Sequence, residues 1–192
     1  SINQMFQGCT HLASVDLSTT LEIGNNAFSN TALTEVSAPN LTRIGNSAFY
    51  GCSSLGTFVL PSTLTSIGDR AFVNTQLRYN ASDFVNLQQI YGHRDGSLFK
   101  NGVNIASGNS HISGDLYSPN LTYLGDKVFM GQSAITKVNL PALQTLYGQG
   151  TFANCTGLTE VVSLGTITEI NGDYNYSTYG TFEGCTSLTS VT

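Results

Sequence analysis

The sequence predicts a solenoid of about eight stacked coils, each about 21–23 residues long unless an insertion lengthens it. A parallel β-sheet is expected along one side, and short helical turns and loops along the other. Two observations lead to this prediction: one six-residue phrase recurs four times, and phenylalanines recur at a nearly constant spacing. A single unit of this size cannot bury its apolar edge, but stacked units bury a continuous core. Residues 1–192 are therefore expected to form one domain.

The recurring phrase is an aliphatic residue, a glycine, two polar residues, a small apolar residue and phenylalanine. Its four copies begin at Ile23, Ile44, Ile67 and Leu124. The full phenylalanine series, expected to form the core of the stack, is Phe6, Phe28, Phe49, Phe72, Phe129, Phe152 and Phe182. Successive gaps are 22, 21, 23, 57, 23 and 30 residues. The typical gap lies in the range of about 20–29 residues found in leucine-rich repeats, and the longest gap is expected to hide one degenerate repeat.

Six of the seven phenylalanines are followed by a segment with strand periodicity. These segments begin at Leu12, Leu33, Leu55, Ile135, Leu158 and Leu188. Alternate side chains of a strand point to opposite faces, so the apolar ones are expected inside and the others in solvent. A second apolar pair and a glycine follow. An Asn or Asp is then expected to cap the short helical turn that presents the next phenylalanine.

Taken together, the repeated segments resemble the BspA-type leucine-rich repeat. The matching phrases are Leu-x-x-Val-x-Leu-Pro, Leu-x-x-Ile-Gly-x-x-Ala-Phe and Gly-Cys-x-x-Leu. The resemblance covers most of the chain and implies a leucine-rich repeat solenoid. Such repeats are common in surface proteins of anaerobic gut and oral bacteria and of some mucosal protists. The resemblance thus implies a non-catalytic cell-surface or secreted module that mediates adhesion by binding a host or matrix protein, or a glycan.

The first irregularity is an insertion at about residues 91–111. It contains the pair Asn101-Gly102, flanked by short runs with apolar residues. An Asn-Gly pair favours the type I′ turn of a hairpin, so a hairpin is expected over residues 97–106. The insertion either patches a discontinuity in the core or contributes to binding.

The second irregularity is a loop insertion at about residues 171–181. It carries Tyr174, Tyr176 and Tyr179 among Asn, Ser and Gly. Tyrosine offers a large rigid contact area, and its small polar neighbours offer adaptable hydrogen bonds, as in recognition loops. These tyrosines are a candidate contact site; the alternative is that they pack back on the solenoid.

The solvent face of the predicted sheet is the other candidate contact site. Its residues include Glu35, Thr57, Val59, Lys137, Asn139 and Glu160. This face is mixed in character and carries few charges. It suits a protein or glycan ligand without selecting one. The alternative function is a structural spacer that binds no ligand of its own.

The four cysteines share one position of the repeat, three residues after a phenylalanine. They are Cys9, Cys52, Cys155 and Cys185, in a column shared with Thr31, Thr75 and Gln132. Such a column suits a small, weakly hydrogen-bonding group at a buried corner. Only the last two cysteines belong to neighbouring coils, so a disulfide framework is not expected. We expect four free, buried thiols and no zinc site.

Composition excludes several classes of function. Only 10% of the residues are charged, the net charge is -5, and the seven basic residues are scattered, so no nucleic-acid partner is expected. No apolar run is long enough to insert into a membrane, and this segment has no signal peptide. His11, His93 and His111 are isolated in the sequence, and no catalytic or phosphate-binding motif is present. We therefore expect no enzyme activity, cofactor or metal.

The ends of the chain also carry information. The chain opens inside a unit, stops at Thr192 in mid-strand and shows no atypical capping repeat. The expectation is a fragment of a longer protein whose signal and anchor lie elsewhere. Its uncapped coils are candidates for end-to-end self-association.

Overall fold

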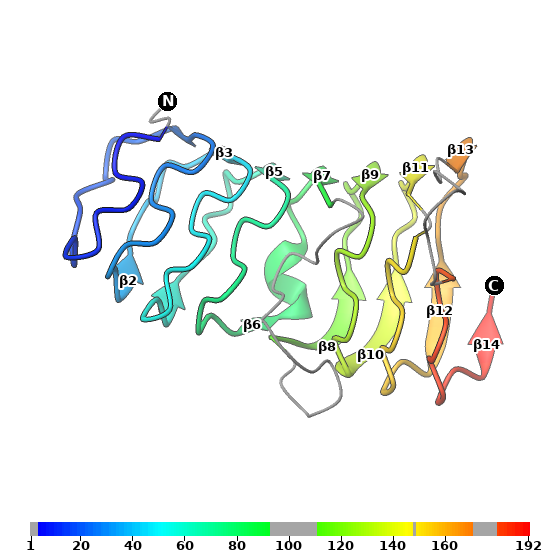
Figure 1. Ribbon diagram of the computed structural model, residues 1–192. Coiled ribbons are helices and arrows are strands. Elements are labelled where there is room, and N and C mark those ends of the chain that lie inside the picture. Colours follow the sequence, from blue (N-terminus) through cyan, green and yellow to red (C-terminus); the bar gives the residue numbers. More distant parts are fainter. Residues whose placement is uncertain (1–3, 93–110, 148, 171–179) are drawn as a thin grey trace.

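The computed structural model describes residues 4–92, 111–147, 149–170 and 180–192. Its coils stack side by side from the amino to the carboxyl end, as Figure 1 shows. One buried apolar cluster runs through the described coils, from Leu17 to Val161. The predicted solenoid is thus confirmed.

The longest sheet comes from the second apolar pair of each repeat and not from the segment after the phenylalanine. It contains seven parallel two-residue strands: β1 (Glu22–Ile23), β3 (Arg43–Ile44), β5 (Ser66–Ile67), β7 (Gln89–Ile90), β9 (Tyr123–Leu124), β11 (Thr145–Leu146) and β13 (Glu169–Ile170). Their aliphatic residues are aligned from coil to coil. The side chains of Ile23, Ile44, Ile67, Ile90, Leu124 and Leu146 are buried.

The number of coils differs from the expectation. The seven strands of this sheet correspond to seven coils in the described ranges, where about eight were expected. Residues 1–3, which precede the turn of Phe6, lie outside those ranges. The aligned residues Ile67, Ile90 and Leu124 place one coil inside the long phenylalanine gap, as predicted.

The segments after the phenylalanines form the second strand side of the solenoid. Five of them pair in parallel: β6 (Tyr79–Asn80), β8 (Ile112–Tyr117), β10 (Ala134–Asn139), β12 (Glu160–Ser163) and β14 (Ser190–Val191). Two earlier ones, β2 (Glu35–Val36) and β4 (Thr57–Phe58), pair only with each other. The described coils therefore carry strands on two sides, where one sheet was expected.

The turns that carry the phenylalanines are not helical, which corrects the expected short helical turns. Alternate N–H groups of each turn donate to the next coil: that of Phe28 to the Ala48 carbonyl, and that of Phe49 to the Ala71 carbonyl, both at 2.9 Å. The residue after the Asn or Asp slot has a positive φ, for example 53° at Asn26. Neither feature is compatible with continuing an α-helix. Within the described coils the only helix is the 3-10 helix η1 (Ala81–Phe84).

At three of the turns the Asn or Asp slot links neighbouring coils and does not cap a helix. The Asn25 Oδ1 accepts the N–H of Asn46 at 2.8 Å, and the Asn46 Oδ1 accepts the N–H of Asp69 at 3.0 Å. Asp126 accepts the N–H of Gln149 in the same way, at 3.2 Å. Asparagine and aspartate share the slot because both present an oxygen acceptor at the same distance from the backbone.

The phenylalanines form a spine of stacked rings, as predicted. Neighbouring ring centroids lie 5.4 Å apart for Phe6 and Phe28, and 5.6 Å apart for Phe28 and Phe49. The spacing near the other end is 5.4 Å between Phe129 and Phe152. These separations are favourable for aromatic pairs.

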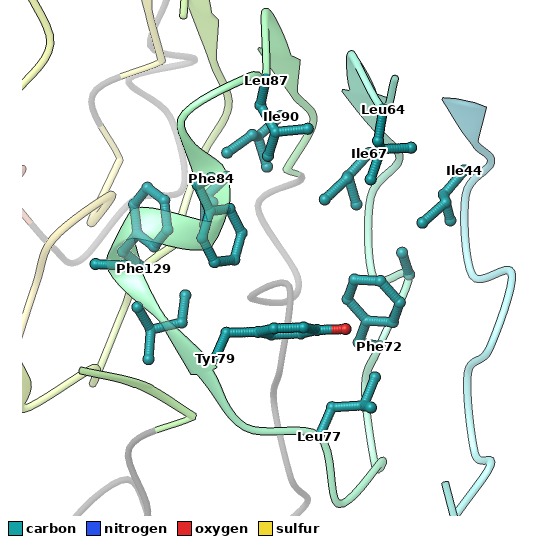
Figure 2. Close-up of a cluster of buried hydrophobic side chains, with 14 of the residues drawn as sticks. Ile44, Leu64, Ile67, Phe72, Leu77, Tyr79, Phe84, Leu87, Ile90 and Phe129 are labelled. Atoms are coloured by element: carbon teal, nitrogen blue, oxygen red, sulfur yellow. The ribbon is translucent and has the colours of Figure 1, made fainter. Parts of the chain in front are cut away.

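Tyr79 and Phe84 fill the place where the spine lacks a repeat phenylalanine (Figure 2). The Tyr79 ring lies 6.1 Å from that of Phe72 and 5.8 Å from that of Phe84, and the Phe84 ring lies 6.1 Å from that of Phe129. The Tyr79 hydroxyl donates to the Phe58 carbonyl at 2.9 Å, across the boundary between β4 and β6. Burial raises the pKa of Tyr79, so the phenol keeps the proton that it donates.

The coil that follows the first insertion is joined to its neighbours through His111 and Gln132. Nδ1 of His111 donates to the Leu77 carbonyl at 2.6 Å. Oε1 of Gln132 accepts the N–H groups of His111 and Ile112, at 2.8 Å and 3.0 Å. His111 is only 3% exposed. These bonds satisfy buried polar groups where the repeat is irregular.

We expect this histidine to make the fold less stable in acid. Burial lowers the pKa of His111, the positive charge of Arg78 lowers it further, and the Leu77 hydrogen bond opposes both effects. The unfolded chain binds a proton below about pH 6.5 more readily than the folded one. The stabilisation is therefore complete above pH 6.5 and falls as the pH drops, by up to about 1.4 kcal/mol per pH unit.

Urea unfolding between pH 7.5 and pH 5.5 measures this effect. The control is His111→Gln, which retains an uncharged donor and should flatten the slope relative to the original chain. Equal slopes in the two proteins would show that His111 is not the responsible group.

Candidate binding surface

The outward side of β8, β10 and β12 carries two rows of exposed or half-buried side chains on either side of a buried row. The register aligns Asp115 with Lys137 and Lys137 with Glu160. The next row, Leu116, Val138 and Val161, is buried in the core. The third row aligns Tyr117 with Asn139 and Asn139 with Ser163. Alternation along the strands thus brings polar side chains from three coils onto one face.

The first row contains charges of both signs in contact. Nζ of Lys137 lies 2.8 Å from Oε2 of Glu160, so the structure brings two of the predicted face residues together. The Thr136 hydroxyl donates to Oδ1 of Asp115 at 2.6 Å. The hydrogen bond and charge of Glu160, with the charge of Asp115, raise the pKa of Lys137. Such an exposed ion pair adds little stability, but it holds the charges in a defined arrangement.

The third row adds exposed aromatic and aliphatic surface; the sequence pattern placed Val162 on the solvent side of the sheet but missed Tyr117. Tyr117 is 49% exposed, and Val162, next to that row on β12, is 39% exposed. Asn139, the predicted contact residue of this row, is half-buried. Tyr117 escaped notice because its strand comes directly after the first insertion and follows no repeat phenylalanine at the usual distance. The signal that could have found it is Leu116, which takes the place of Val138 in the next coil.

The remaining predicted face residues lie on the other side of a break in the strand series. Glu35 and Thr57 are exposed and aligned with each other on β2 and β4. Val59, directly after β4, is 80% exposed. These three are separated from Lys137 and Glu160 by the coils of β6 and β8. The residues of the predicted face therefore form two separate surfaces, one on β2 and β4 and one on β10 and β12.

The predicted loop tyrosines Tyr174, Tyr176 and Tyr179 lie outside the described residues, as does the hairpin predicted over 97–106. Both remain predictions.

A second row of aromatic residues lies on the seven-stranded sheet and was not foreseen. The rings of Tyr91 and Tyr123 have centroids 4.9 Å apart, and those of Tyr123 and Tyr147 lie 5.6 Å apart. All three side chains are half-buried. We call these residues the tyrosine ladder. The tyrosine ladder could have been found from the sequence by one signal. Each of its tyrosines lies next to an aliphatic residue of the sheet, and these residues, Ile90, Leu124 and Leu146, are aligned with one another.

All four cysteines are free, as predicted. Three of the thiols donate to the carbonyl of the phenylalanine one coil earlier: Cys52 to Phe28 at 2.9 Å, Cys155 to Phe129 at 3.1 Å, and Cys185 to Phe152 at 3.1 Å. The prediction that all four are buried is wrong, because Cys9 is exposed and Cys185 is half-buried. Both lie in the outermost described coils, which a neighbouring coil covers on one side only.

This arrangement predicts unequal thiol reactivity. Burial raises the pKa of Cys155 to about 12 and raises that of Cys52 as well. Because the thiolate is the reactive form, a thiol reagent at neutral pH should modify Cys9 first and the two buried thiols about a hundredfold more slowly. Mass spectrometry of the native protein measures the order, and Cys9→Ser should abolish the fast phase. Rapid labelling of Cys155 would contradict the packing described.

Neither a metal site nor a membrane-spanning helix is found in the described part of the chain. No three His, Cys, Asp or Glu side chains gather there in a way that could hold a metal ion. None of its helices has the length and apolar character needed to cross a bilayer.

The comparison with protein families agrees with the repeat register. The profile of the BspA type leucine rich repeat region matches residues 2–105 and 115–192, in six copies. The chain belongs to the BspA-type leucine-rich repeat family. A BspA-type solenoid is a protein-interaction or structural repeat module, and leucine-rich repeat solenoids are in general not catalytic. No curated protein gives a significant match.

Solved structures resemble this BspA-type solenoid at low sequence identity. The leucine-rich repeat protein TpLRR of T. pallidum has a TM-score of 0.52 at 19% identity, over 92% of this chain and 75% of that chain. A leucine-rich repeat protein from Bacteroides ovatus has a TM-score of 0.49 at 22% identity, over 97% of this chain. A leucine rich cell surface protein from Faecalibacterium prausnitzii has a TM-score of 0.44 at 20% identity, over 75% of this chain and 43% of that chain. The match to the T. pallidum protein shows the fold alone. The chain spans about half, 56%, of the B. ovatus chain.

Proposed function

We propose that this chain is a non-catalytic binding module of a cell-surface or secreted protein that mediates adhesion to a host or matrix protein. The observation that carries the proposal is the outward face of β8, β10 and β12, where Tyr117 and Val162 are exposed beside the Lys137–Glu160 pair. We call this surface the strand face. BspA-type proteins are typically surface-exposed or secreted, which supports the proposed location.

The composition of the strand face favours a protein ligand. Exposed tyrosine is enriched at the centre of protein interfaces, and charged pairs are common at their rim. Asp115, Lys137 and Glu160 offer both signs of charge at one edge of the surface, which suits a mixed partner better than a strongly basic or acidic one. The buried row beneath keeps the strands rigid, so little ordering is needed on binding.

The test uses the 192-residue chain in binding assays on immobilised matrix proteins and on mucosal epithelial cells. The double variant Tyr117→Ala and Val162→Ala should weaken binding by about tenfold or more, because it removes the exposed centre of the strand face. The matched control is Tyr50→Ala, which removes a tyrosine from a phenylalanine turn and should bind normally. Deletion of residues 172–180 separately tests the predicted tyrosine loop.

The outcomes discriminate between the candidate functions. Normal binding by both the double variant and the deletion variant would show that the contact site lies elsewhere. If the intact chain binds none of these surfaces, the structural spacer is the better interpretation.

A further inference from the structure

The tyrosine ladder is built by a departure from the repeat. In the coils of β1, β3, β5 and β9 the residue after the aliphatic one is glycine, and at β3 and β5 the neighbouring coil leaves no room for a side chain there. A Cβ at Gly45 would lie 2.6 Å from the Asn25 nitrogen, and one at Gly68 would lie 2.4 Å from the Gly45 carbonyl carbon. Tyr91 and Tyr147 occupy this position in their coils, and in both the glycine is displaced by one residue in the sequence. Each of these coils thus gains a residue, and that residue is a tyrosine.

The third tyrosine, Tyr123, precedes the aliphatic residue of its strand, whereas Tyr91 and Tyr147 follow theirs. The register aligns Gln89 with Tyr123 and Tyr123 with Thr145, all on the outward side of β7, β9 and β11. Tyr123 lies between the rings of Tyr91 and Tyr147. The ladder therefore crosses three successive coils and runs along the axis of the stack.

The chemistry of this surface is aromatic and hydrogen-bonding. The Tyr91 hydroxyl donates to the Gln89 side-chain carbonyl at 2.7 Å. Burial, together with the neighbouring Tyr147, Tyr91 and Asp126, raises the pKa of Tyr123 to about 12, so the phenol is uncharged at neutral pH. The negative charge of Asp126 disfavours an anionic ligand here.

The position of the ladder fits a binding role. The first insertion follows β7 in the sequence, and the second follows β13. Because the strand order is β7-β9-β11-β13, the tyrosine ladder lies between the strand that precedes the first insertion and the strand that precedes the second. In solenoids, insertions map to one face, which is often the binding face.

We propose that the tyrosine ladder is a second binding surface, which takes a linear, uncharged glycan lying along the solenoid axis. The successive ring separations of 4.9 Å and 5.6 Å are close to the length of one sugar residue in a β-linked chain, so the ladder and an extended glycan along the axis have a similar repeat. Sugar C–H groups pack on aromatic rings, and sugar hydroxyls bond to phenol, amide and hydroxyl groups such as those of Gln89 and Thr145.

The same geometry disfavours a proline-rich peptide. Such peptides dock into grooves lined by aromatic residues. Neighbouring ladder rings are in contact, tilted by 41° and 50° to each other, and leave no slot for a proline ring between them. The ligand must lie over the ladder, as an extended glycan can.

The test measures binding of the 192-residue chain to neutral β-linked hexasaccharides of glucose, xylose and mannose by calorimetry, with a uronic-acid hexasaccharide as the charged comparison. The triple variant Y91S/Y123S/Y147S should lose at least about tenfold in affinity for the bound neutral hexasaccharide. The triple variant Y91F/Y123F/Y147F keeps the rings and should lose less. Tyr117→Ser, the same change on the strand face, should bind the hexasaccharide normally, which separates this proposal from the protein-binding function.

Tyr91→Ser alone, at the end of the ladder, serves as the second variant if the triple serine variant does not fold; it should weaken binding by about threefold or more. The proposal is overturned if none of the neutral hexasaccharides binds, if the serine variants bind like the original chain, or if the uronic-acid hexasaccharide binds more tightly. The proposal is also overturned if the serine variants no longer bind a matrix protein that the original chain binds, while the original chain binds no hexasaccharide.

Discussion

Phe84→Ala is expected to lower the free energy of unfolding by about 3–5 kcal/mol, the usual cost of truncating a fully buried phenylalanine. Phe84 is 0% exposed and connects Tyr79 to Phe129 in the part of the spine that lacks a repeat phenylalanine. Each coil contacts only its neighbours, so a cavity at this point should uncouple the two halves of the stack. We therefore also expect the single thermal transition to split into two.

Calorimetry and urea unfolding measure both effects. The matched control is Phe6→Ala, which removes the same side chain from a half-buried position at one end of the spine. It should cost about 1–2 kcal/mol and keep a single transition, because only one neighbouring ring loses its partner. A loss no larger for Phe84 than for Phe6 would show that the 3-10 helix does not bridge the spine.

Gly68→Ala is expected to destabilise the protein by about 3 kcal/mol, at the upper end of the range for overpacking. The added methyl group would lie 2.4 Å from the carbonyl carbon of Gly45 and 2.5 Å from the nitrogen of Asn46. Both atoms belong to the backbone of the neighbouring coil and cannot move aside as a flexible side chain would. The two coils must separate, which lengthens the bond from the Gly68 N–H to the Ile44 carbonyl, now 2.8 Å.

Gly56→Ala provides the matched control, because no atom lies within 4 Å of a Cβ at that position. Its free energy of unfolding should change by no more than about 1 kcal/mol, and the change should be stabilising if the backbone accepts alanine. Urea unfolding of the two variants gives the comparison. Similar values for both would mean that the coils are not packed as closely at Gly68 as the structure shows.

Much of the fold could be predicted because the coils bury apolar residues at equivalent positions of the repeat. The spacing of Phe28, Phe49 and Phe72 sets the coil length, and the alternation in segments such as Val36–x–Ala38 identifies a strand. One degenerate coil could be inferred from the long gap. The repeat alone did not reveal that Tyr79 and Phe84 supply the missing rings, because their positions match no phrase.

The secondary structure of the turns was harder to predict. A Gly followed by Asn or Asp is typical of a helix start, and the local sequence offers nothing against it. The decisive partner of Asn25 is the N–H of Asn46, one whole coil away. Likewise, the two-residue strands such as Arg43–Ile44 are too short for any periodicity, and they exist because the coils on either side pair with them.

The candidate surfaces, too, could be predicted in part from the repeat and depend in part on contacts between coils. Lys137 and Glu160 could be placed on one face from the strand pattern, and the structure shows them in contact. Tyr117 follows the first insertion, and Tyr91 and Tyr147 lie where a coil has an added residue, so the alignment of these tyrosines depends on the path of the chain between coils. No counting of residues along the sequence determines that path.

By itself, the sequence determined the class of architecture, the coil length and the family, because repeated units with the same apolar positions bury those side chains by stacking on one another. The tertiary structure alone decided which side carries the longest sheet, what fills the gap in the spine and which side chains meet across coils. The physical reason is that these features depend on hydrogen bonds and packing between residues about 20 or more positions apart. Their geometry is set only when the coils are stacked.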